Sequence, residues 1–501
     1  MIQPKWPSGV RRDTVLIWVA VIAFVLALTI HADVSRANLD RHGDMVENYA
    51  WGTLWQWGYY KHPPFFAWLT AAWFEIFPKI DANYFLFSAV NAGVALLAVW
   101  RIAARYGDGK MQLLAVYCAA VIPPVAFLAI KYNANSAMTP IWAWLFVFYL
   151  RGIEKRKLAD AVMLGLLSGI AMLTKYHSAV ILATLLAHAA WDKETRSVLL
   201  SLFGAVTLGV FLVIMAPHAY WLFNNEFLPF VYAASQGDGL WADVFFSIGK
   251  FLVALPLYGV PALLIALLMH HDPKLLRWPT YLAGLRRLTH SVEGRALLAV
   301  CVGPTVLTVL LGIAAAADLS AGWGIPFFPP LAVLVAYLVP DALRHRNMHR
   351  ANIAFAIYLA AMVAIAPILG RMERDVDISN QDVPIANLAH AMDDIWSRQG
   401  DARPGFYVAG EVFLANGMSF YSKYAPVIVE GNSLDYSKGY MSRTDLLRRG
   451  GMAACLKSDT LCQDEVRRIM PATVSPEPLV VKGLNGVSDW NFVVWVLPPS
   501  T

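Results

Sequence analysis

The chain contains few charged residues. Asp, Glu, Lys and Arg make up 15% of its 501 residues, against about 25% in soluble globular proteins, and 58% are hydrophobic. This composition excludes an ordinary soluble domain and predicts an integral membrane protein. The net charge of +5 does not indicate nucleic-acid binding, because the basic loops that orient a membrane protein account for much of it.

Two kinds of motif are also missing. The sequence has no glycine-rich loop of the nucleotide-binding type and no His/Cys cluster with the spacing of a zinc site. Cysteine is rare, and Cys118 and Cys301 lie in apolar segments, where a thiol packs as a small hydrophobic group. These features support neither a bound nucleotide nor a zinc ion.

Long apolar runs are abundant instead. Arg11 and Arg12 precede the first of them without a small-residue cleavage site, so we expect a retained first helix. Residues 63–78 are apolar and aromatic but short, which fits a helix lying at the membrane interface. Eleven windows predict membrane-spanning helices, at residues 14–31, 83–100, 111–130, 136–150, 158–173, 177–191, 197–216, 248–269, 296–317, 324–340 and 351–370.

The distribution of Lys and Arg predicts the orientation. If the N-terminus lies in the cytoplasm, the inner segments hold far more Lys and Arg than the outer ones. An odd number of spans then places everything after residue 370 outside. Residues 1–370 would form the membrane domain, with a first outer loop at residues 32–82.

Residues 371–501 differ from the rest of the chain. They are polar, and short runs of β-forming residues near 405–409, 426–429, 480–481 and 492–496 alternate with helical patterns at 387–397 and 443–449. This predicts a small α/β domain with its own core. Cys455 and Cys462 lie within it, and outside the cytoplasm such a pair predicts a disulfide, the alternative being two free thiols.

The first outer loop contains candidate catalytic acids. Asp44 and Glu47 are three residues apart and share one face of a helical turn. Such a pair could act as a general base and its support, or hold a divalent cation. The alternative is two ordinary solvated acids, and Asp33 and Asp40 are further acids of the same loop.

The same loop ends with cations and aromatic residues. Lys61 and His62 precede Pro63-Pro64, which suits the start of a helix, where a phosphate is favoured. Cations that reach toward lipid headgroups are the alternative. Tyr59 and Tyr60 could line a sugar site or belong to an interfacial aromatic belt.

Other polar residues fall at turns on the same side of the membrane. Lys131 and Lys175 are candidate phosphate ligands because ionisable residues at membrane depth are often functional, although they could also extend toward headgroups. The candidates for contact with a sugar or an acceptor are Asn133, Asn135, His218 and Trp221, with a structural loop as the alternative for the last two. Gly322-Trp323-Gly324 reads mainly as close packing.

At this point the residues resemble a known family. An acidic first loop followed by Gly58-Tyr59-Tyr60-Lys61-His62-Pro63-Pro64 is similar to the GT-C membrane glycosyltransferases, with further likeness at Leu173 to Tyr176 and His218 to Trp221. The branch is that of lipid A aminoarabinose transferase, protein O-mannosyltransferases and bacterial galacturonosyltransferases. The resemblance covers roughly residues 14–340 and implies a helical membrane bundle of about eleven spans.

The resemblance also implies a function. Family members transfer a sugar with inversion from a polyprenyl-phosphate donor to a periplasmic or lumenal acceptor, here a glycolipid, glycan or protein of the cell envelope. A lipid-linked donor fits, since nucleotide sugars are confined to the cytoplasm. The family's first-loop base carries over to Asp44, and Lys61 and His62 fall where relatives contact metal or phosphate. The protein would lie in a bacterial inner membrane.

This sequence departs from the family at two points. Relatives show an adjacent Asp-Glu pair, whereas here two residues separate Asp44 from Glu47. Many relatives place an acid in the second outer loop, where this chain has Asn133 and Asn135. A divalent cation therefore remains an open option. A flippase for a lipid-linked sugar and a membrane scaffold are the alternatives, although neither requires an acid poised in the first loop.

Overall fold

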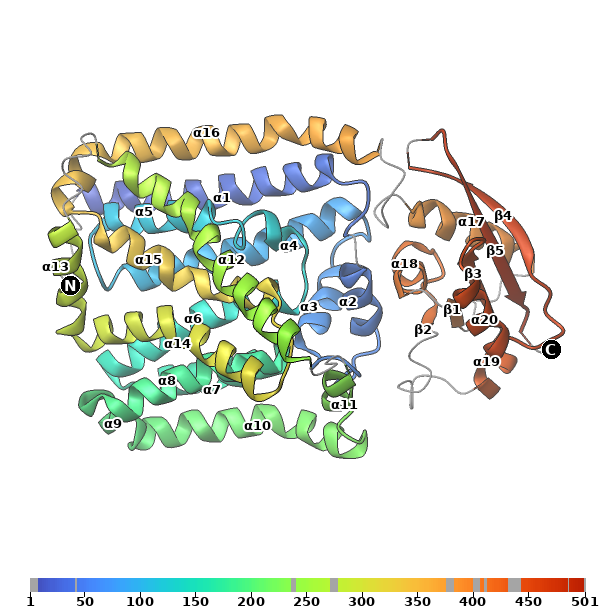
Figure 1. Ribbon diagram of the computed structural model, residues 1–501, viewed down its shortest axis with the longest axis horizontal. Coiled ribbons are helices and arrows are strands. Elements are labelled where there is room, and N and C mark those ends of the chain that lie inside the picture. The colour runs from blue at the N-terminus through green and yellow to red at the C-terminus, as the bar shows by residue number, and fades with distance from the viewer. Residues whose placement is uncertain are drawn as a thin grey trace, which may run out of the picture. The chain divides into compact units, whose positions relative to one another are not determined.

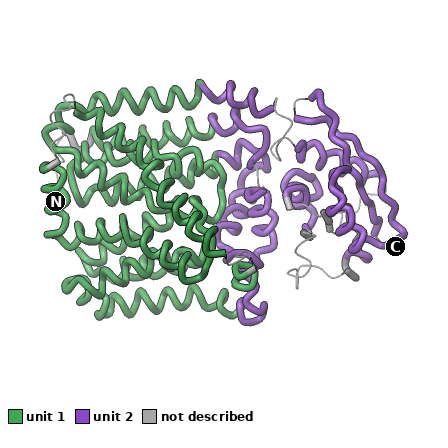
Figure 2. Tube along the Cα trace, viewed as in Figure 1, with its two compact units in different colours: residues 1–30, 86–221, 230–364 green, residues 31–85, 222–229, 365–501 purple. Residues whose placement is uncertain are grey.

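The structure is a computed structural model, and it describes residues 8–40, 43–235, 240–270, 278–374, 383–399, 406–409, 412–430, 443–484 and 486–499. The contacts within the chain divide it into two compact units (Figure 2). The first contains residues 1–30, 86–221 and 230–364, and the second contains residues 31–85, 222–229 and 365–501. The first outer loop thus belongs to the same unit as the polar C-terminal part. The domain boundary at residue 370 stays a prediction.

The described part of the first unit is built from helices (Figure 1). Four of them, α1 (Ser8–Ser35), α4 (Asp81–Ala103), α10 (Leu202–Asn224) and α16 (Asp341–Arg374), continue into the second unit, and α11 (Leu228–Ser235) begins there. The others are α5 (Gly109–Ala120), α6 (Ala134–Lys155), α7 (Leu158–Thr174), α8 (Ala179–Trp191), α9 (Lys193–Leu199), α12 (Trp241–Leu268), α13 (Trp278–Thr289), α14 (Val292–Ala314) and α15 (Phe328–Leu338). Short 3₁₀ segments are η1 (Phe127–Ile130), η2 (Tyr176–Ser178) and η4 (Ala321–Phe327).

Seven helices in the described part are long and apolar enough to cross a membrane. They lie at Arg12–Ser35, Asp81–Ala103, Leu202–Asn224, Trp241–Leu268, Val292–Ala314, Ala321–Leu338 and Asp341–Arg374. Each coincides with one of the eleven predicted windows, so the chain is a multi-pass membrane protein. The other four windows also fall on helices, α5 to α8, which do not reach these limits of length and hydropathy.

The predicted span at residues 111–130 is wrong beyond its first half. Helix α5 ends at Ala120, and Pro123 and Pro124 follow. Proline has no backbone N–H and disfavours helical geometry in the residue before it, so the helix cannot run on. The chain instead forms turns and the 3₁₀ segment η1 before α6 begins.

The second unit combines helices with a mixed sheet. Two first-loop helices, α2 (Asp44–Gly52) and α3 (Phe65–Phe74), occur with α17 (Ile385–Ser397), α18 (Val412–Tyr421), α19 (Arg443–Arg449) and α20 (Thr460–Ile469). The strands are β1 (Phe406–Ala409), β2 (Val427–Glu430), β3 (Gly451–Leu456), β4 (Glu477–Lys482) and β5 (Asp489–Leu497), in the order β2-β1-β3-β5-β4. Strand β1 pairs in parallel with β2 and β3, and β5 pairs antiparallel with β3 and β4. The predicted α/β architecture is therefore present.

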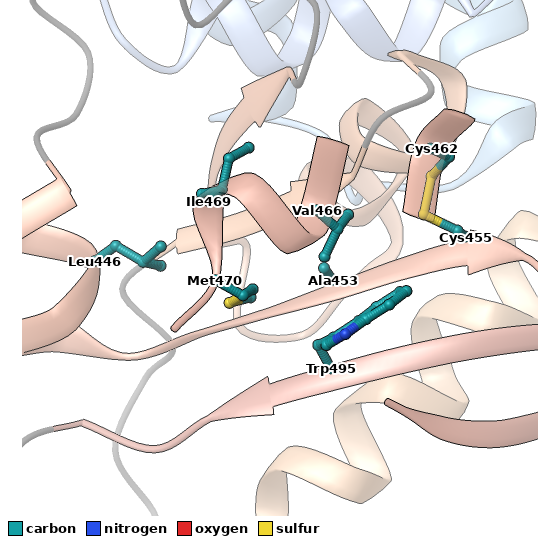
Figure 3. Packing of buried hydrophobic residues seen from close by; sticks show 8 residues of the cluster. All are labelled: Leu446, Ala453, Cys455, Cys462, Val466, Ile469, Met470 and Trp495. Atoms are coloured by element: carbon teal, nitrogen blue, oxygen red, sulfur yellow. A yellow bond between two sulfur atoms is a disulfide. The ribbon is translucent and has the colours of Figure 1, made fainter. Parts of the chain in front are cut away.

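The core of this sheet lies between β3, β5 and helix α20. Ala453 and Trp495 are opposite each other in the β3–β5 register, and Val466 of α20 is fully buried against the same cluster (Figure 3). Cys455 at the end of β3 forms a disulfide with Cys462 of α20 (Figure 3). The disulfide fastens the helix to the central strand.

Candidate functional site

The first-loop acids lie at the start of α2, and the local sequence fixes that start. Gly43 has φ +76°, in the left-handed region that favours glycine, and a Cβ there would lie 3.0 Å from the ring of Phe413. The backbone N–H of Asp44 donates to Asp40 Oδ1 at 3.2 Å, and that of Met45 to Asp40 Oδ2 at 2.7 Å. Asp40 is buried and satisfies two of the helix's unpaired donors.

Asp44 and Glu47 both lie in the first turn of α2, as their spacing predicts. Asp44 is partly exposed, whereas Glu47 is buried. Carboxylates are favoured at a helix N-terminus by the exposed backbone N–H groups. Asp33 is exposed at the end of α1. The geometry thus distinguishes the four acids, with Asp44 partly accessible and Asp40 used as a cap.

Glu47 forms an ion pair with Lys61. The Nζ atom of Lys61 lies 2.6 Å from Glu47 Oε1, and the two side chains are 18% and 9% exposed. The same ammonium group lies over the rings of Trp51, at 5.6 Å, and Tyr60, at 5.1 Å. Lys61 is therefore held in place by a carboxylate and two aromatic faces.

Trp51 is the centre of an aromatic cluster. Tyr59 stacks on it with ring centroids 5.0 Å apart and donates its hydroxyl to the Trp51 carbonyl oxygen at 2.7 Å. Tyr60 and His62 meet Trp51 edge to face. Tyr59 and Tyr60 are buried, whereas Lys61 and His62 are partly exposed. We therefore assign Tyr59 to the packing of the loop.

The prolines after His62 have the role that the sequence predicts. Helix α3 begins at Phe65, directly after Pro63-Pro64. It then crosses α2 closely, because a Cβ at Gly52 would lie 2.2 Å from the carbonyl oxygen of Ala67. This contact and the Trp51 cluster connect the acids of α2 to the cations before α3.

Helix α18 packs against α2 within the second unit. Phe420 contacts the rings of Tyr49 and Tyr84 at centroid distances of 5.3 and 5.6 Å. Tyr84 in turn donates its hydroxyl to the carbonyl oxygen of Met45 at 2.6 Å. Tyr421 Oη donates to Asp81 Oδ1 at 2.8 Å. The C-terminal part therefore supplies the packing surface for α2, a relationship that hydropathy does not reveal.

A divalent cation does not fit the first-loop acids well. No group of three His, Cys, Asp or Glu side chains that could hold a metal ion occurs in the described ranges. The acid that would complete a pair with Asp44 is Glu47, and the Lys61 ammonium group lies 2.6 Å from it. A second cation at that carboxylate would be repelled, so we assign no step to a metal ion.

The other candidates lie in the first unit, where Asn133 is a helix cap. Its Oδ1 accepts from the backbone N–H groups of Asn135 and Ser136 at 2.9 and 3.2 Å, and Ser136 Oγ accepts from the N–H of Asn133. This is a capping box at the start of α6. The sugar contact of Asn133 stays a prediction, and its side chain caps α6.

Lys175 joins two turns of the first unit. Its Nζ donates to Asn135 Oδ1 at 2.7 Å and lies 5.6 Å from the ring centroid of Trp323. Trp323 comes from η4, where the sequence mainly predicts close packing. The ring of His177 contacts the rings of Trp323 and Trp142, with centroid distances of 5.5 and 5.9 Å. Lys131 is partly exposed at the turn before α6.

His218 and Trp221 lie three residues apart on α10, and their rings stack with centroids 6.0 Å apart. His218 is fully buried, and its Nε2 shares a hydrogen bond of 2.9 Å with the hydroxyl of Tyr176. Burial raises the pKa of Tyr176, so this phenol keeps its proton. The pair fixes α10 to the turn after α7, and Trp221 remains partly exposed.

The predicted residues therefore form two clusters. In the second unit, Asp44, Glu47, Lys61 and the aromatic residues around Trp51 come together. In the first unit, Lys175 meets Asn135, and His218 meets Trp221. Sequence reasoning did not foresee the contacts of Trp323 with His177 and Lys175 or the cap formed by Asp40. The Asn133-x-x-Ser136 pattern was a visible signal for the capping box.

Known proteins resemble this chain in sequence and in fold. Residues 61–221 match the family described as dolichyl-phosphate-mannose-protein mannosyltransferase. The lipopolysaccharide core galacturonosyltransferase RgtA of Rhizobium johnstonii is 27% identical over 418 residues, 74% of each chain. RgtB of the same organism is 28% identical over 176 residues, 34% of each chain.

Two crystal structures share the fold across nearly the whole chain. ArnT from Cupriavidus metallidurans in the apo state has a TM-score of 0.60 at 14% identity and covers 98% of each chain. ArnT bound to undecaprenyl phosphate has a TM-score of 0.57 at 14% identity, covering 96% of this chain and 97% of that one. The GT-C architecture predicted from the sequence is confirmed.

Proposed function

We propose that the chain is a membrane glycosyltransferase of the GT-C superfamily and that it transfers a sugar from a polyprenyl-phosphate donor to a cell-envelope glycan. The proposed acceptor class is lipopolysaccharide, supported by the name of the relative RgtA. The donor class is supported by the undecaprenyl phosphate bound in ArnT. The proposed location is a bacterial inner membrane, with the N-terminus in the cytoplasm and residues 371–501 in the periplasm.

The observation that carries the proposal is the placement of Asp44. It is the partly exposed acid in the first turn of α2, and Asp40 and Gly43 fix that turn. A carboxylate held on a capped helix can accept a proton in a defined direction. Glu47 is less suited to this role because it is buried and paired with Lys61.

The reaction follows from these assignments. The acceptor hydroxyl oxygen bonds to the anomeric carbon of the donor sugar while its proton passes to the Asp44 carboxylate. The bond from the anomeric carbon to the phosphate oxygen breaks, and its electron pair leaves with the polyprenyl phosphate. The configuration at the anomeric carbon is inverted. Lys61 and His62 stabilise the charge that develops on the phosphate. Lys175 stays a candidate phosphate ligand on the sequence alone.

A donor panel tests this proposal. Purified protein in detergent is incubated with different polyprenyl-phosphate sugars and a cell-envelope extract as acceptor, and released polyprenyl phosphate is measured by mass spectrometry. We expect release from one donor by the wild type, a loss of at least about a hundredfold in Asp44→Asn, and wild-type release in Glu75→Gln. Glu75 is an exposed acid after α3.

The outcomes separate the parts of the proposal. Full transfer by a normally folded Asp44→Asn variant contradicts the assignment of the base. No release from any polyprenyl-phosphate sugar contradicts the donor class.

A further inference from the structure

An apolar cavity lies in the first unit, and none of the proposed catalytic residues lines it. It has a volume of about 480 Å³, within the range of about 300–1,000 Å³ typical of small-molecule sites. Its walls come from α6, α7, α8, α9 and α10 (Figure 1). Leu186, Leu200 and Leu208 line it and are 55%, 79% and 57% exposed, so it opens on the surface of the unit.

The position of α10 explains why the cavity exists. This helix packs on α7 through small residues, since a Cβ at Gly165 would lie 2.5 Å from the carbonyl oxygen of Thr207. Only 11% of the apolar stretch of α10 is buried inside the protein. Helix α10 therefore lies at the periphery, and the space on its α8 side is left unfilled by protein.

The hydroxyl groups that line the cavity are already used within the protein. Tyr149 donates to the Leu185 carbonyl oxygen at 3.2 Å, Ser168 to that of Leu164 at 2.7 Å, and Ser201 to that of Val198 at 2.6 Å. Thr207 donates to the carbonyl oxygen of Phe203, and Thr195 donates to the Asp192 carboxylate. A ligand in this space therefore meets apolar surface, which suits a hydrocarbon chain.

The end of the cavity at α9 carries positive charge. Arg156 follows the end of α6 and donates to Ser197 of α9 at 2.7 Å, next to the lining residues Thr195 and Val198. The exposed cations there are Lys155, Arg156, Lys157, Lys193 and Arg196.

The acids near this end reduce its charge little. Glu154 is paired with Arg105, Asp160 with Arg151, and Asp192 with Arg295. Glu194 is a further exposed acid beside this cluster. At this end of the cavity, the exposed cations therefore outnumber the acids that lack a basic partner.

We propose that this cavity binds one anionic diacyl phospholipid of the surrounding bilayer. One acyl chain enters between α8 and α10, and the phosphate lies against the cations around Arg156 and Arg196. An apolar slot that ends in excess positive charge complements this ligand in both parts. The site is independent of the proposed transfer reaction.

Native mass spectrometry of the full chain in detergent tests the proposal. Phosphatidylglycerol and phosphatidylcholine with identical acyl chains are titrated separately, and undecaprenyl phosphate serves as a third probe. We expect phosphatidylglycerol to bind about tenfold more tightly than phosphatidylcholine, because Lys and Arg side chains attract an anionic headgroup.

Two leucines of α10 provide a matched pair of variants. Leu208 lines the cavity, and Leu212 lies one turn further along the same helix at almost the same exposure, 55%, without lining it. Leu208→Trp should abolish the tight phosphatidylglycerol adduct, whereas Leu212→Trp should retain it. Ala205→Phe is a second cavity-filling variant in case the first fails to fold.

The headgroup contact has its own test. Combined Arg156→Gln and Arg196→Gln should reduce phosphatidylglycerol binding to the level of phosphatidylcholine, whereas Arg346→Gln and Arg350→Gln on α16 should not. Equal loss in the Leu208 and Leu212 variants, equal binding of the two phospholipids by the wild type, or preferred binding of undecaprenyl phosphate would each overturn the proposal.

Discussion

The Nζ atom of Lys61 lies 2.6 Å from Glu47 Oε1, which joins a residue before α3 to the first turn of α2. Both side chains are largely shielded from water, so each charge depends on the other. The pair holds the loop together, and the phosphate contact proposed for Lys61 can be tested separately from this structural role.

Lys61→Met should lower both stability and transfer. It leaves the buried Glu47 carboxylate without this cation, at a cost of about 2–4 kcal/mol, and it removes a proposed phosphate contact. The double variant Lys61→Met, Glu47→Gln should regain most of the thermal midpoint in detergent, because neither charge remains. Transfer should stay low in the double variant. Recovery of transfer together with stability would contradict the phosphate role of Lys61.

Lys175 should contribute to transfer through its charge. It is held by Asn135 Oδ1 at 2.7 Å and by the ring of Trp323. Lys175→Met should reduce kcat/KM for the donor by about 10- to 100-fold, as expected for the loss of one charge-assisted contact.

A second lysine provides the control for this variant. Lys250 lies 4.5 Å from the ring centroid of Phe246 and is exposed. Lys250→Met should leave kcat/KM within about twofold of wild type, because a charge at an exposed site contributes little. Equal losses in the two variants would indicate a general effect of charge near the membrane, and Lys175 would then have no specific role.

Much of the architecture was predictable from local pattern. Helices α17 and α19 lie where the sequence predicts them, and ten of the eleven apolar windows fall on helices, whereas the window at 111–130 does so only in its first half. Strand β3 was missed because Gly451, Ala453 and Ala454 favour strands weakly and its stability comes from pairing with β1 and β5. A strand of this kind is defined by its neighbours.

The candidate site was predictable only in part. The spacing of Asp44 and Glu47 placed both acids on one helical turn, as the structure has them. The pair of Lys175 and Asn135 joins residues 40 positions apart, and its formation depends on how the helices pack. Periodicity and composition carry no information about such a contact. The cap by Asp40 likewise depends on the left-handed conformation of Gly43.

Tyr421→Phe should destabilise the second unit. Its hydroxyl donates to Asp81 Oδ1 at 2.8 Å, and its loss should cost about 1–3 kcal/mol because a partly buried carboxylate loses a hydrogen bond. Burial and, secondly, the nearby Asp81 raise the pKa of Tyr421. A raised pKa means that this contribution is present below the unfolded value of about 10 and is lost as the pH rises above it.

The thermal midpoint at pH 7 and at pH 11 measures this effect. The difference between wild type and Tyr421→Phe should be large at pH 7 and smaller at pH 11. A constant difference at both pH values would contradict the role of the buried hydroxyl.

Asp192 connects α9 to α14 and offers a pH-dependent test of the first unit. It accepts a hydrogen bond of 2.7 Å from Arg295 Nε, and its carboxylate also caps α9 through the N–H groups of Glu194 and Thr195. Burial tends to raise the pKa of Asp192, but the hydrogen bonds from Arg295 and Thr195 outweigh it, so the pKa lies below its ordinary value. The stabilisation is therefore present above about pH 4 and is lost as the pH falls further.

Two substitutions separate the ion pair from the cap. Asp192→Asn keeps a side-chain oxygen for the cap and removes the charge, which should cost about 1–2 kcal/mol because Arg295 is partly exposed. Asp192→Ala removes both and should cost about 1 kcal/mol more. Thermal unfolding in detergent between pH 3 and pH 7 should show the wild-type advantage over Asp192→Asn disappearing at low pH. If that advantage is unchanged at pH 3, the carboxylate charge is not its source, and the amide substitution acts through packing instead.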